Sequence, residues 1–230
     1  MELGSQPQVE VELTRDGSAT LYTARFNQHY HSIHGAIQES QHVFIEAGLS
    51  SIEDPAGKLR ILEMGMGTGL NVLLTSLAEK KYVIEYHALE AYPLAEAQWL
   101  SLNYQERLDE AEAALQFEAI HQGPWEEAFE VRPSFSLSKF AQRLEEYEPK
   151  VRYHVVYWDA FAPEAQPELW TEAVWERVFS WLEPGGIWVS YCAKGAVRRG
   201  LQSAGFTVER LPGPPGKREM LRARKPVVSE

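Results

Sequence analysis

A glycine-rich turn between an apolar run and a helical pattern constrains this chain more than any other feature. The stretch RILEMGMGTGLNVLL, residues 60–74, carries Gly65, Gly67 and Gly69 at alternate positions. Glycine accepts positive φ angles and has no Cβ, so such a turn lets the backbone approach a ligand closely. The turn can serve a dinucleotide, a nucleoside sulfonium or no ligand at all, and the rest of the chain has to decide.

Apolar runs and helical patterns alternate along the chain. Strands are expected at residues 59–64, 85–90, 115–120, 153–159, 186–191, 207–211 and 219–224, and helices at 70–79, 94–103, 168–182 and 196–204. Such alternation predicts an α/β fold with a mostly parallel sheet covered on both faces. The last two strands are joined by PGPPGKR, which is too short for a helical crossover, so we expect an antiparallel hairpin. This order resembles the Rossmann-like class I fold of S-adenosylmethionine-dependent methyltransferases.

The N-terminal residues follow a different pattern. VEVELTRDGSATLYTA alternates in polarity around Asp16 and Gly17, which predicts a β-hairpin. Apolar spacing predicts a helix over residues 35–47, with Gly48 suited to its C-terminal cap. We therefore expect residues 1–50 to form an extension packed on a methyltransferase domain of residues 51–230.

Composition and charge exclude several classes of protein. The 230 residues are 44% hydrophobic, contain one cysteine, Cys192, and begin with no apolar segment. They predict a cytoplasmic protein without a disulfide framework, a cysteine-rich metal cluster or a membrane anchor. The net charge is -11, yet residues 185–230 hold nine Lys and Arg against three acidic residues. This basic end either attracts a polyanion or is solvated surface.

The spacing of the glycines separates the possible ligands. A dinucleotide turn needs G-x-G-x-x-G, but position 70 is Leu. Methyltransferase loops of the form E/D-x-G-x-G-x-G match Glu63 and the three glycines directly. Glu90 ends the second expected strand and suits the ribose hydroxyls, and Asp159 ends a later strand at the same edge of the sheet. The alternatives are a plain tight turn, an exposed Glu90 and an Asp159 that only caps its turn.

Several motifs together resemble one family. ILEMGMGTGLN, DAFAPEAQPELWT, EPGG, GAVRRGLQSAGF and GKREML are similar to the methyltransferase of the tRNA 5-methylaminomethyl-2-thiouridine pathway, in its MnmC-domain or stand-alone MnmD form. FNQHYHSIHGAIQESQHVFIEAGL resembles the stand-alone members. The resemblance spans about residues 14–225. It implies methyl transfer from S-adenosylmethionine to the amine of 5-aminomethyl-(2-thio)uridine at the wobble position, in the anticodon arm of tRNA.

The resemblance and the strand ends together predict the site residues. We expect cofactor contacts from Glu63, Gly65, Gly67, Thr68, Gly69, Asn71, Glu90, Ala91, Gly123, Trp125, Asp159 and Phe161. The catalytic candidates are Asp159, Glu39 and Tyr30, and the candidate tRNA contacts are Lys194, Arg198, Arg199, Lys217 and Arg218. Gly123 and Trp125 stand where many methyltransferases have an adenine-binding Asp after the third strand. Residues 128–143 look like an inserted hairpin of unknown role.

Three functions from different classes stay open at this point. The leading one is the tRNA amine methyltransferase, for which another enzyme would supply the aminomethyl precursor. The second is a small-molecule amine methyltransferase or an aminopropyltransferase-like enzyme with the same nucleoside pocket. The third is a non-catalytic RNA-binding module, which the acidic crevice disfavours. His29, His31, His34 and His42 suggest a metal site, but their spacing fits no common ligand pattern and amine methylation needs no metal, so we expect none.

Overall fold

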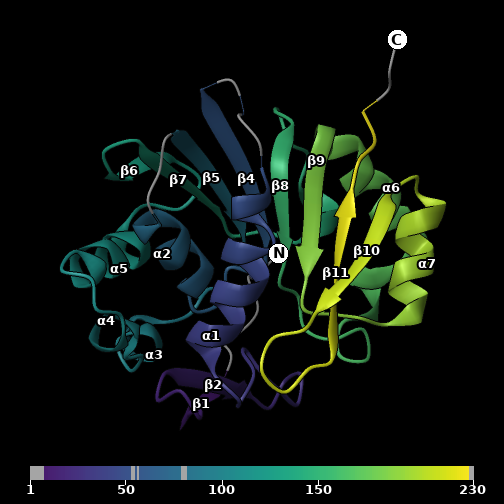
Figure 1. Ribbon diagram of the computed structural model, residues 1–230. Helices are drawn as coiled ribbons and strands as arrows, with labels where there is room; N and C mark the ends of the chain where they lie inside the picture. Colours follow the sequence, from purple (N-terminus) through teal and green to yellow (C-terminus); the bar gives the residue numbers. More distant parts are fainter. Residues whose placement is uncertain (1–7, 53–54, 56, 79–81, 228–230) are drawn as a thin grey trace.

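The computed structural model describes residues 8–52, 55, 57–78 and 82–227. Its centre is an eight-stranded sheet with the order β10-β11-β9-β8-β4-β5-β7-β6 (Figure 1). These strands are β4 (Lys58–Met64), β5 (Val83–Leu89), β6 (Ala128–Arg132), β7 (Phe135–Phe140), β8 (Tyr153–Trp158), β9 (Leu182–Ser190), β10 (Thr207–Pro212) and β11 (Glu219–Arg224). The five strands β7, β5, β4, β8 and β9 pair parallel. β10, β11 and β9 pair antiparallel, which confirms the expected hairpin at the end of the chain.

Both faces of the central strands are buried, because consecutive residues of one strand pack into two different hydrophobic cores. On β4, Ile61 belongs to the core under one layer of helices and Leu62 to the core under the other. On β8, Tyr157 and Trp158 divide in the same way. Adjacent apolar residues, such as Ile61 and Leu62 on β4 and residues 155–158 on β8, are typical of parallel strands between two helical layers.

Helices cover both faces of the sheet, as the alternating pattern predicted. They are α2 (Leu70–Leu77), α3 (Glu96–Trp99), α4 (Tyr104–Arg107), α5 (Ala113–Gln122), α6 (Glu172–Trp181) and α7 (Gly195–Ser203). Figure 1 shows α2 and α5 on the side of β4 and β5, and α6 and α7 beside β10. The expected end of the first of these helices, at residue 79, lies outside the described residues.

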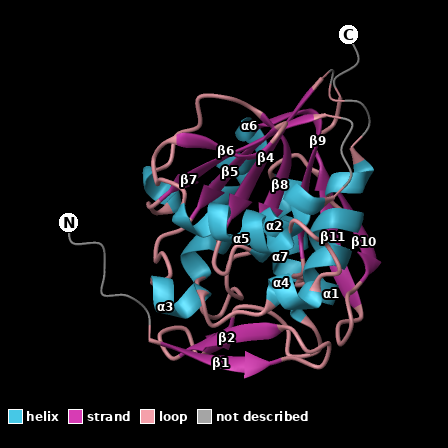
Figure 2. Cartoon of the chain, turned by 90° about the vertical axis from the view of Figure 1, so that its left-hand side faces the viewer, coloured by secondary structure: helices cyan, strands magenta, loops and turns pink. Residues whose placement is uncertain are grey.

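The N-terminal hairpin forms a small sheet of its own. β1 (Val9–Leu13) pairs antiparallel with β2 (Ala19–Thr23), and β3 (Gln28–His29) adds to β2. Figure 2 shows β1 and β2 at the lower edge of the molecule, below the helices. The helix expected over residues 35–47 is present as α1 (Ala36–Ser40), which continues as a π-helix over Gln41–Glu46. The extension therefore lies across the end of the sheet to which the glycine turn belongs.

Three predictions for the middle of the chain are wrong. Residues 115–120 are not a strand but the centre of α5, where buried Gln116, Phe117 and Ile120 follow a helical spacing. The helix expected over 94–103 is only the four residues of α3, followed by a turn and α4. Residues 128–143 do contain a hairpin, β6–β7, yet β7 supplies the third parallel strand of the sheet beside β5. The hairpin is therefore part of the sheet rather than an insertion.

Candidate active site

The glycine turn has the backbone geometry that its sequence predicted. Gly65, Gly67 and Gly69 have φ angles of 87°, 50° and 73°, in the left-handed region that side chains disfavour. A Cβ on Gly65 would lie 2.8 Å from the carbonyl oxygen of Asp159, and one on Gly67 would lie 2.9 Å from Cδ1 of Tyr30. The turn is therefore packed against the end of β8 and against the N-terminal extension.

A first cavity lies beside this turn, at the carboxyl ends of β4, β5 and β8. Its walls are the backbone of the turn, the residues after β5, the residues after β8 and two residues of the extension. The lining residues are Tyr30, His31, Met64, Gly65, Met66, Gly67, Thr68, Glu90, Ala91, Tyr92, Asp159, Ala160, Phe161 and Gln166. Among these described residues there are two carboxylates and no Lys or Arg, which suits a cationic ligand rather than a phosphate.

Hydrogen bonds from neutral donors hold the carboxylates of this region. Glu90 accepts a 2.8 Å bond from the Gly67 N–H and another from the Tyr92 N–H. The amide of Asn71 donates at 2.8 Å both to Glu63 and to Asp159. Asn71 therefore joins the carboxyl group beneath the turn to the one at the end of β8.

Burial determines the protonation of these acids. It raises the pKa of Asp159 to about 7, with the charge of Glu39 adding to the rise, while the Asn71 hydrogen bond and Lys217 oppose it. Burial also raises the pKa of Glu63 well above its usual value and that of Glu90 to a lesser extent. Glu63 is fully buried and does not line the cavity, so it supports Asn71 rather than facing a ligand. Asp159 is poised to change charge near neutral pH.

A second cavity, of about 390 Å³, adjoins the first and shares Asp159 with it. It lies between the extension, the end of β8 and the residues after β9, and its polar walls include His31, Glu39, Tyr191 and Lys217. Lys217 Nζ lies 2.7 Å from Oε1 of Glu39 and 3.8 Å from the centre of the Tyr191 ring. The structure thus brings the three catalytic candidates, Asp159, Glu39 and Tyr30, to one pair of cavities.

Aromatic rings pack against one another beside the first cavity, and three of them, from Tyr30, Tyr92 and Phe161, line it. The Phe161 ring lies 5.1 Å from the ring of Tyr30 and 4.7 Å from that of Phe26, which in turn lies 6.0 Å from Tyr92. Burial and the charge of Glu90 raise the pKa of Tyr30, so its phenol stays neutral. The extension therefore contributes a wall to the site, which the strand-end rule alone did not predict.

The other expected cofactor contacts do not all lie in the first cavity. Thr68 is buried in the turn and accepts a 3.1 Å bond from the Tyr104 hydroxyl, and Ala91 lines the first cavity. Gly123 ends α5, and a Cβ there would overlap the Phe129 ring. Trp125 pairs with Lys139 near the end of β7. Neither Gly123 nor Trp125 lines the first cavity, because the strand that was to position them is a helix. Their contact with adenine stays a prediction.

Two polar residues of these cavities, Tyr191 and His31, have no role predicted from the sequence. Tyr191 follows β9 directly, and its hydroxyl donates a 2.9 Å bond to the Ala160 carbonyl. The rule that selected Asp159, a polar residue after a parallel strand, would also have selected Tyr191. His31 lines both cavities, and burial lowers its pKa to about 4, so it is a neutral base at pH 7.

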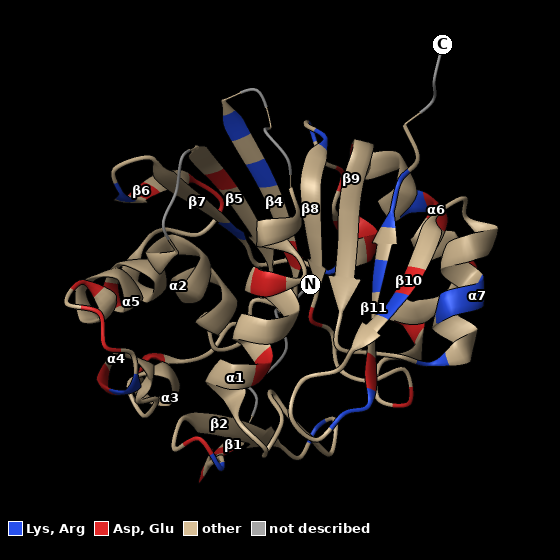
Figure 3. Cartoon of the chain, viewed as in Figure 1, with Lys and Arg blue, Asp and Glu red and all other residues tan. Residues whose placement is uncertain are grey.

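Basic side chains follow one another along α7, β11 and the loop before β11, and others lie elsewhere, for example on β4 (Figure 3). Many of these side chains hold the fold together: Arg222 and Arg224 donate to backbone carbonyls, and so does Lys225. Lys194 pairs with Glu164, and Arg198 donates to Gln202. Arg199 and Arg218 are exposed. The basic end is thus partly structural and partly available to a ligand.

The histidines of the extension are dispersed. His29 lies 3.1 Å from Glu12, His42 lies 3.3 Å from Glu46, and His34 packs against Gly216. Within the described ranges, no group of three or more His, Cys, Asp and Glu side chains is arranged to hold a metal ion. None of the helices described for this chain is both long and apolar enough to cross a bilayer.

Comparisons with known proteins agree with this geometry. A model of the S-adenosyl-L-methionine-dependent methyltransferase family matches residues 116–226. The crystal structure of MnmC2 from Aquifex aeolicus is 26% identical, with a TM-score of 0.73, and the match covers 98% of this chain and 74% of that one. The bifunctional protein MnmC of tRNA 5-methylaminomethyl-2-thiouridine biosynthesis from Pseudomonas aeruginosa is 31% identical over 225 residues, 91% of this chain and 34% of that protein. The chain spans about a third of the length of the curated relatives it matches.

A more distant likeness concerns the fold alone. Spermidine synthase from Thermotoga maritima has a TM-score of 0.58 at 10% identity, over 96% of this chain and 70% of that one. Strand order, glycine turn and acidic cavity together define a class I methyltransferase that uses S-adenosylmethionine. Within that class, the chain is similar to about a third of the bifunctional protein MnmC and to MnmC2.

The first cavity fits S-adenosylmethionine on its own chemistry. The ligand is a nucleoside with a positively charged sulfonium and no phosphate, and the cavity offers two carboxylates and no cation among its described residues. Two glycines of the turn, Gly65 and Gly67, line it at φ angles that keep side chains out. When bound there, S-adenosylmethionine supplies an electrophilic methyl group.

Proposed function

We propose that this protein transfers a methyl group to the primary amine of 5-aminomethyl-(2-thio)uridine at the wobble position of tRNA. The observation that carries the proposal is the pair of cavities that share Asp159, one suited to the cofactor and one open beside it. The names of the relatives, MnmC of tRNA 5-methylaminomethyl-2-thiouridine biosynthesis and MnmC2, support the choice of substrate.

In this proposal Asp159 is the catalytic residue. It stands where the two cavities meet, so it can accept a hydrogen bond from an amine in the second cavity and orient the nitrogen lone pair toward the first. Its carboxylate also balances the positive charge that develops on the nitrogen. Glu63 and Asn71 support it, and Tyr30 closes the cavity over the glycine turn.

The remaining cofactor contacts follow from the lining of the first cavity. Glu90 suits the ribose hydroxyls, because each of its oxygens accepts one backbone N–H and retains a further lone pair. Phe161 and Ala91 supply apolar surface on either side. The amide hydrogen bonds to Glu90 also hold the turn in the shape that the ligand needs.

We propose that the anticodon arm docks on the basic side, through Lys194, Arg198, Arg199 and Arg218. A hollow lined by Tyr191, Lys194, Lys217 and Arg218 adjoins the second cavity and connects this side with Asp159. Phosphate contacts make binding depend on salt. In the double variant Arg198→Glu with Arg199→Glu, we expect weaker tRNA binding, unchanged cofactor affinity, and a slope of log K against log salt lower by about 0.7 to 0.9 for each lost contact. Equal tRNA affinity at all salt concentrations would show that α7 is solvated surface.

The substrate has to arrive with its amine already present, so we propose that a separate reaction makes the aminomethyl precursor before this step. The proposal also places the protein in the cytoplasm, with its tRNA substrate. The decisive experiment is mass spectrometry of tRNA nucleosides from a strain that lacks the gene. We expect the unmethylated aminomethyl nucleoside to accumulate and purified protein to methylate it in that tRNA. An unchanged nucleoside profile, or turnover of polyamines in preference to tRNA, would refute the proposal.

A further inference from the structure

The ion pair between Lys217 and Glu39 lies in the wall of the second cavity. Glu39 comes from α1 and Lys217 from the loop between β10 and β11, so the pair joins two segments that are far apart in the sequence. The Glu39 side chain is 7% exposed and that of Lys217 33%. Its environment therefore differs from that of an ion pair in open solvent, where the interaction is weak.

Both partners are held in place by further contacts. Glu39 accepts a 2.7 Å bond from the Ser32 N–H through its other oxygen. Lys217 lies over the ring of Tyr191, whose hydroxyl is bonded to the Ala160 carbonyl. The loop that carries Lys217 also contacts the extension at His34. The Lys217 side chain thus lines the second cavity, where it pairs with Glu39, and also the hollow that leads to the basic side.

The proposed reaction requires a neutral substrate amine, and the charges of this ion pair affect whether the amine is protonated. An amine attacks through its lone pair, so the ammonium form that predominates in water is inert. Two carboxylates, Asp159 and Glu39, line the second cavity, and together they would hold the substrate as ammonium. The other titratable groups there are His29, His31, Tyr30, Tyr191 and Lys217, and Cys192 and Asp16 lie just beyond. Lys217 is the one Lys or Arg side chain among these described groups.

We infer that Lys217 acts by its charge to keep the substrate amine neutral: it cancels Glu39 and leaves Asp159 as the single carboxylate that faces the nitrogen. This inference rests on the proposed function. Lys217, which the sequence placed among the tRNA contacts, is then a positioning residue of the reaction. Its ammonium group repels the protonated form of the substrate amine and does not itself react.

The chemical step balances in this arrangement. The substrate ammonium loses its proton to water as it enters the cavity, and the neutral nitrogen keeps its lone pair. Methyl transfer forms the N–C bond and breaks the S–C bond, whose electron pair stays on the sulfur. The positive charge moves from sulfur to nitrogen, so the net charge in the site is unchanged. The product leaves as a methylammonium, and the step needs no other co-reactant.

The test is the pH dependence of methylation in charge variants of the pair. In Lys217→Met we expect the acidic limb of the single-turnover rate to move up by about 1 to 2 pH units, the size of one nearby charge removed from a partly buried site. The rate at pH 7 falls about tenfold or more and recovers at high pH. Lys217→Arg should keep the wild-type profile, and Glu39→Gln should move the limb down.

A binding measurement reports the pH dependence of amine protonation in the site without turnover. The difference in affinity between aminomethylated and unmodified tRNA, titrated with pH, reports the protonation of the bound amine, and it should shift in parallel with the rate. Arg218→Met is the matched control, a neighbouring cation on the exposed side. It should raise KM and leave the limb where it is.

Each outcome bears on one proposal only. If wild-type protein fails to methylate the tRNA, the proposed function is wrong. If wild-type protein is active and Lys217→Met loses tRNA affinity with the limb unmoved, Lys217 is a phosphate contact and the inference is wrong. An unmoved limb in folded Glu39→Gln would also overturn it.

Discussion

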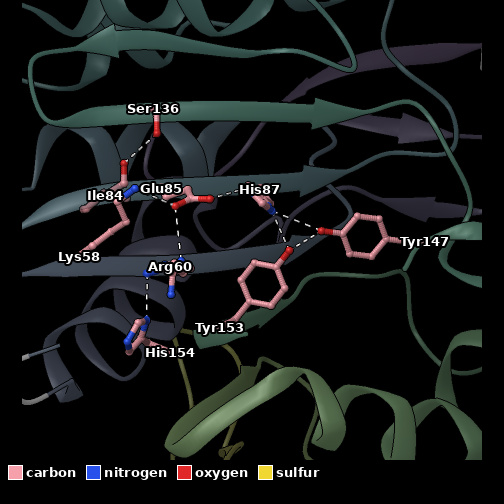
Figure 4. Close-up of polar contacts among 9 residues, drawn as sticks. All are labelled: Lys58, Arg60, Ile84, Glu85, His87, Ser136, Tyr147, Tyr153 and His154. Atoms are coloured by element: carbon pink, nitrogen blue, oxygen red, sulfur yellow. Dashed lines mark hydrogen bonds and ion pairs between the residues drawn. The ribbon is translucent and has the colours of Figure 1, made fainter. Parts of the chain in front are cut away.

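Acidic residues at the two ends of the central sheet have different partners: charged side chains at one end and neutral hydrogen-bond donors at the other. At the amino end, Glu85 on β5 lies 3.1 Å from Lys58 and 3.5 Å from Arg60 on β4, and 3.4 Å from His87 on its own strand (Figure 4). At the carboxyl end of the same strands, Glu63 and Glu90 accept bonds only from neutral donors: an amide, a phenol and backbone N–H groups.

The difference appears in the pKa values. Burial raises the pKa of Glu85, but the hydrogen bond from Lys58 and the charges around it outweigh burial, so the pKa lies below its usual value. The pKa values of Glu63, Glu90 and Asp159 are all raised. One end compensates its charge within the protein, and the other leaves negative charge for a cationic ligand to compensate. Uncompensated groups of this kind lower stability and mark functional sites.

The largest effect is expected at the carboxyl end, from Asp159→Asn. The substitution keeps the shape and removes the charge, so turnover should fall on the order of a hundredfold or more, the usual scale of such a contribution. Cofactor affinity should fall far less than turnover, because Glu90 remains in the first cavity. Single-turnover methylation of purified precursor tRNA at several pH values is the measurement. A near-normal rate at neutral pH would make Asp159 a structural residue and direct the search to Glu39 and Tyr30.

The same variant tests the comparison through stability. Because the pKa of Asp159 is raised in the folded protein, its ionisation disfavours folding at pH values above the unfolded pKa of 3.8. Asp159→Asn should therefore melt at a higher temperature than wild type. The difference in melting temperature between the variant and wild type should increase between pH 4 and 7 and stay constant above pH 7. A variant that is less stable than wild type at pH 8 would contradict this account of the carboxyl end.

The second effect concerns the glycine turn. In Gly67→Val, the new side chain meets the Tyr30 ring and occupies space beside the first cavity. We expect cofactor affinity, measured by calorimetry, to fall at least about tenfold, while the ring of Tyr30 yields and the fold survives. Gly57→Val is the control, because Gly57 also has a positive φ but a Cβ there meets no atom within 4 Å. Unchanged affinity in folded Gly67→Val would exclude this turn from the cofactor site.

The smallest effect is expected at the amino end, from Glu85→Gln. It leaves Lys58 and Arg60 without their shared acid and should cost about 1 kcal/mol of unfolding free energy, with turnover unchanged. Since the pKa of Glu85 is lowered, its contribution is present above the unfolded pKa of 4.5 and is lost as pH falls below it. Urea unfolding at pH 7 and pH 3.5 measures both values. A loss of turnover in a stable variant would mean that the two ends are coupled.

The residues at the carboxyl end of the sheet were predicted from the sequence more accurately than the strands and helices around them. The turn, Glu90 and Asp159 were found because strand, glycine and acid follow one another within short segments. The third parallel strand was misplaced because residues 115–120 are apolar enough for a strand, whereas their burial pattern is helical. β7, FSLSKF, alternates polar and apolar residues although it is largely buried, and Lys139 within it donates to the carbonyls of Ile120 and His121. A buried lysine that caps a helix cannot be recognised from local sequence.

By itself the sequence determined the class of fold, the glycine turn and the acid after β8, because each depends on residues adjacent in the chain. Only the tertiary structure decided that the N-terminal extension contributes a wall to both cavities and that Lys217 pairs with Glu39, 178 positions away. It also decided which basic residues hold the fold and which remain exposed. These contacts form only when the sheet brings distant segments to one edge, and the protonation of Asp159 follows from that burial.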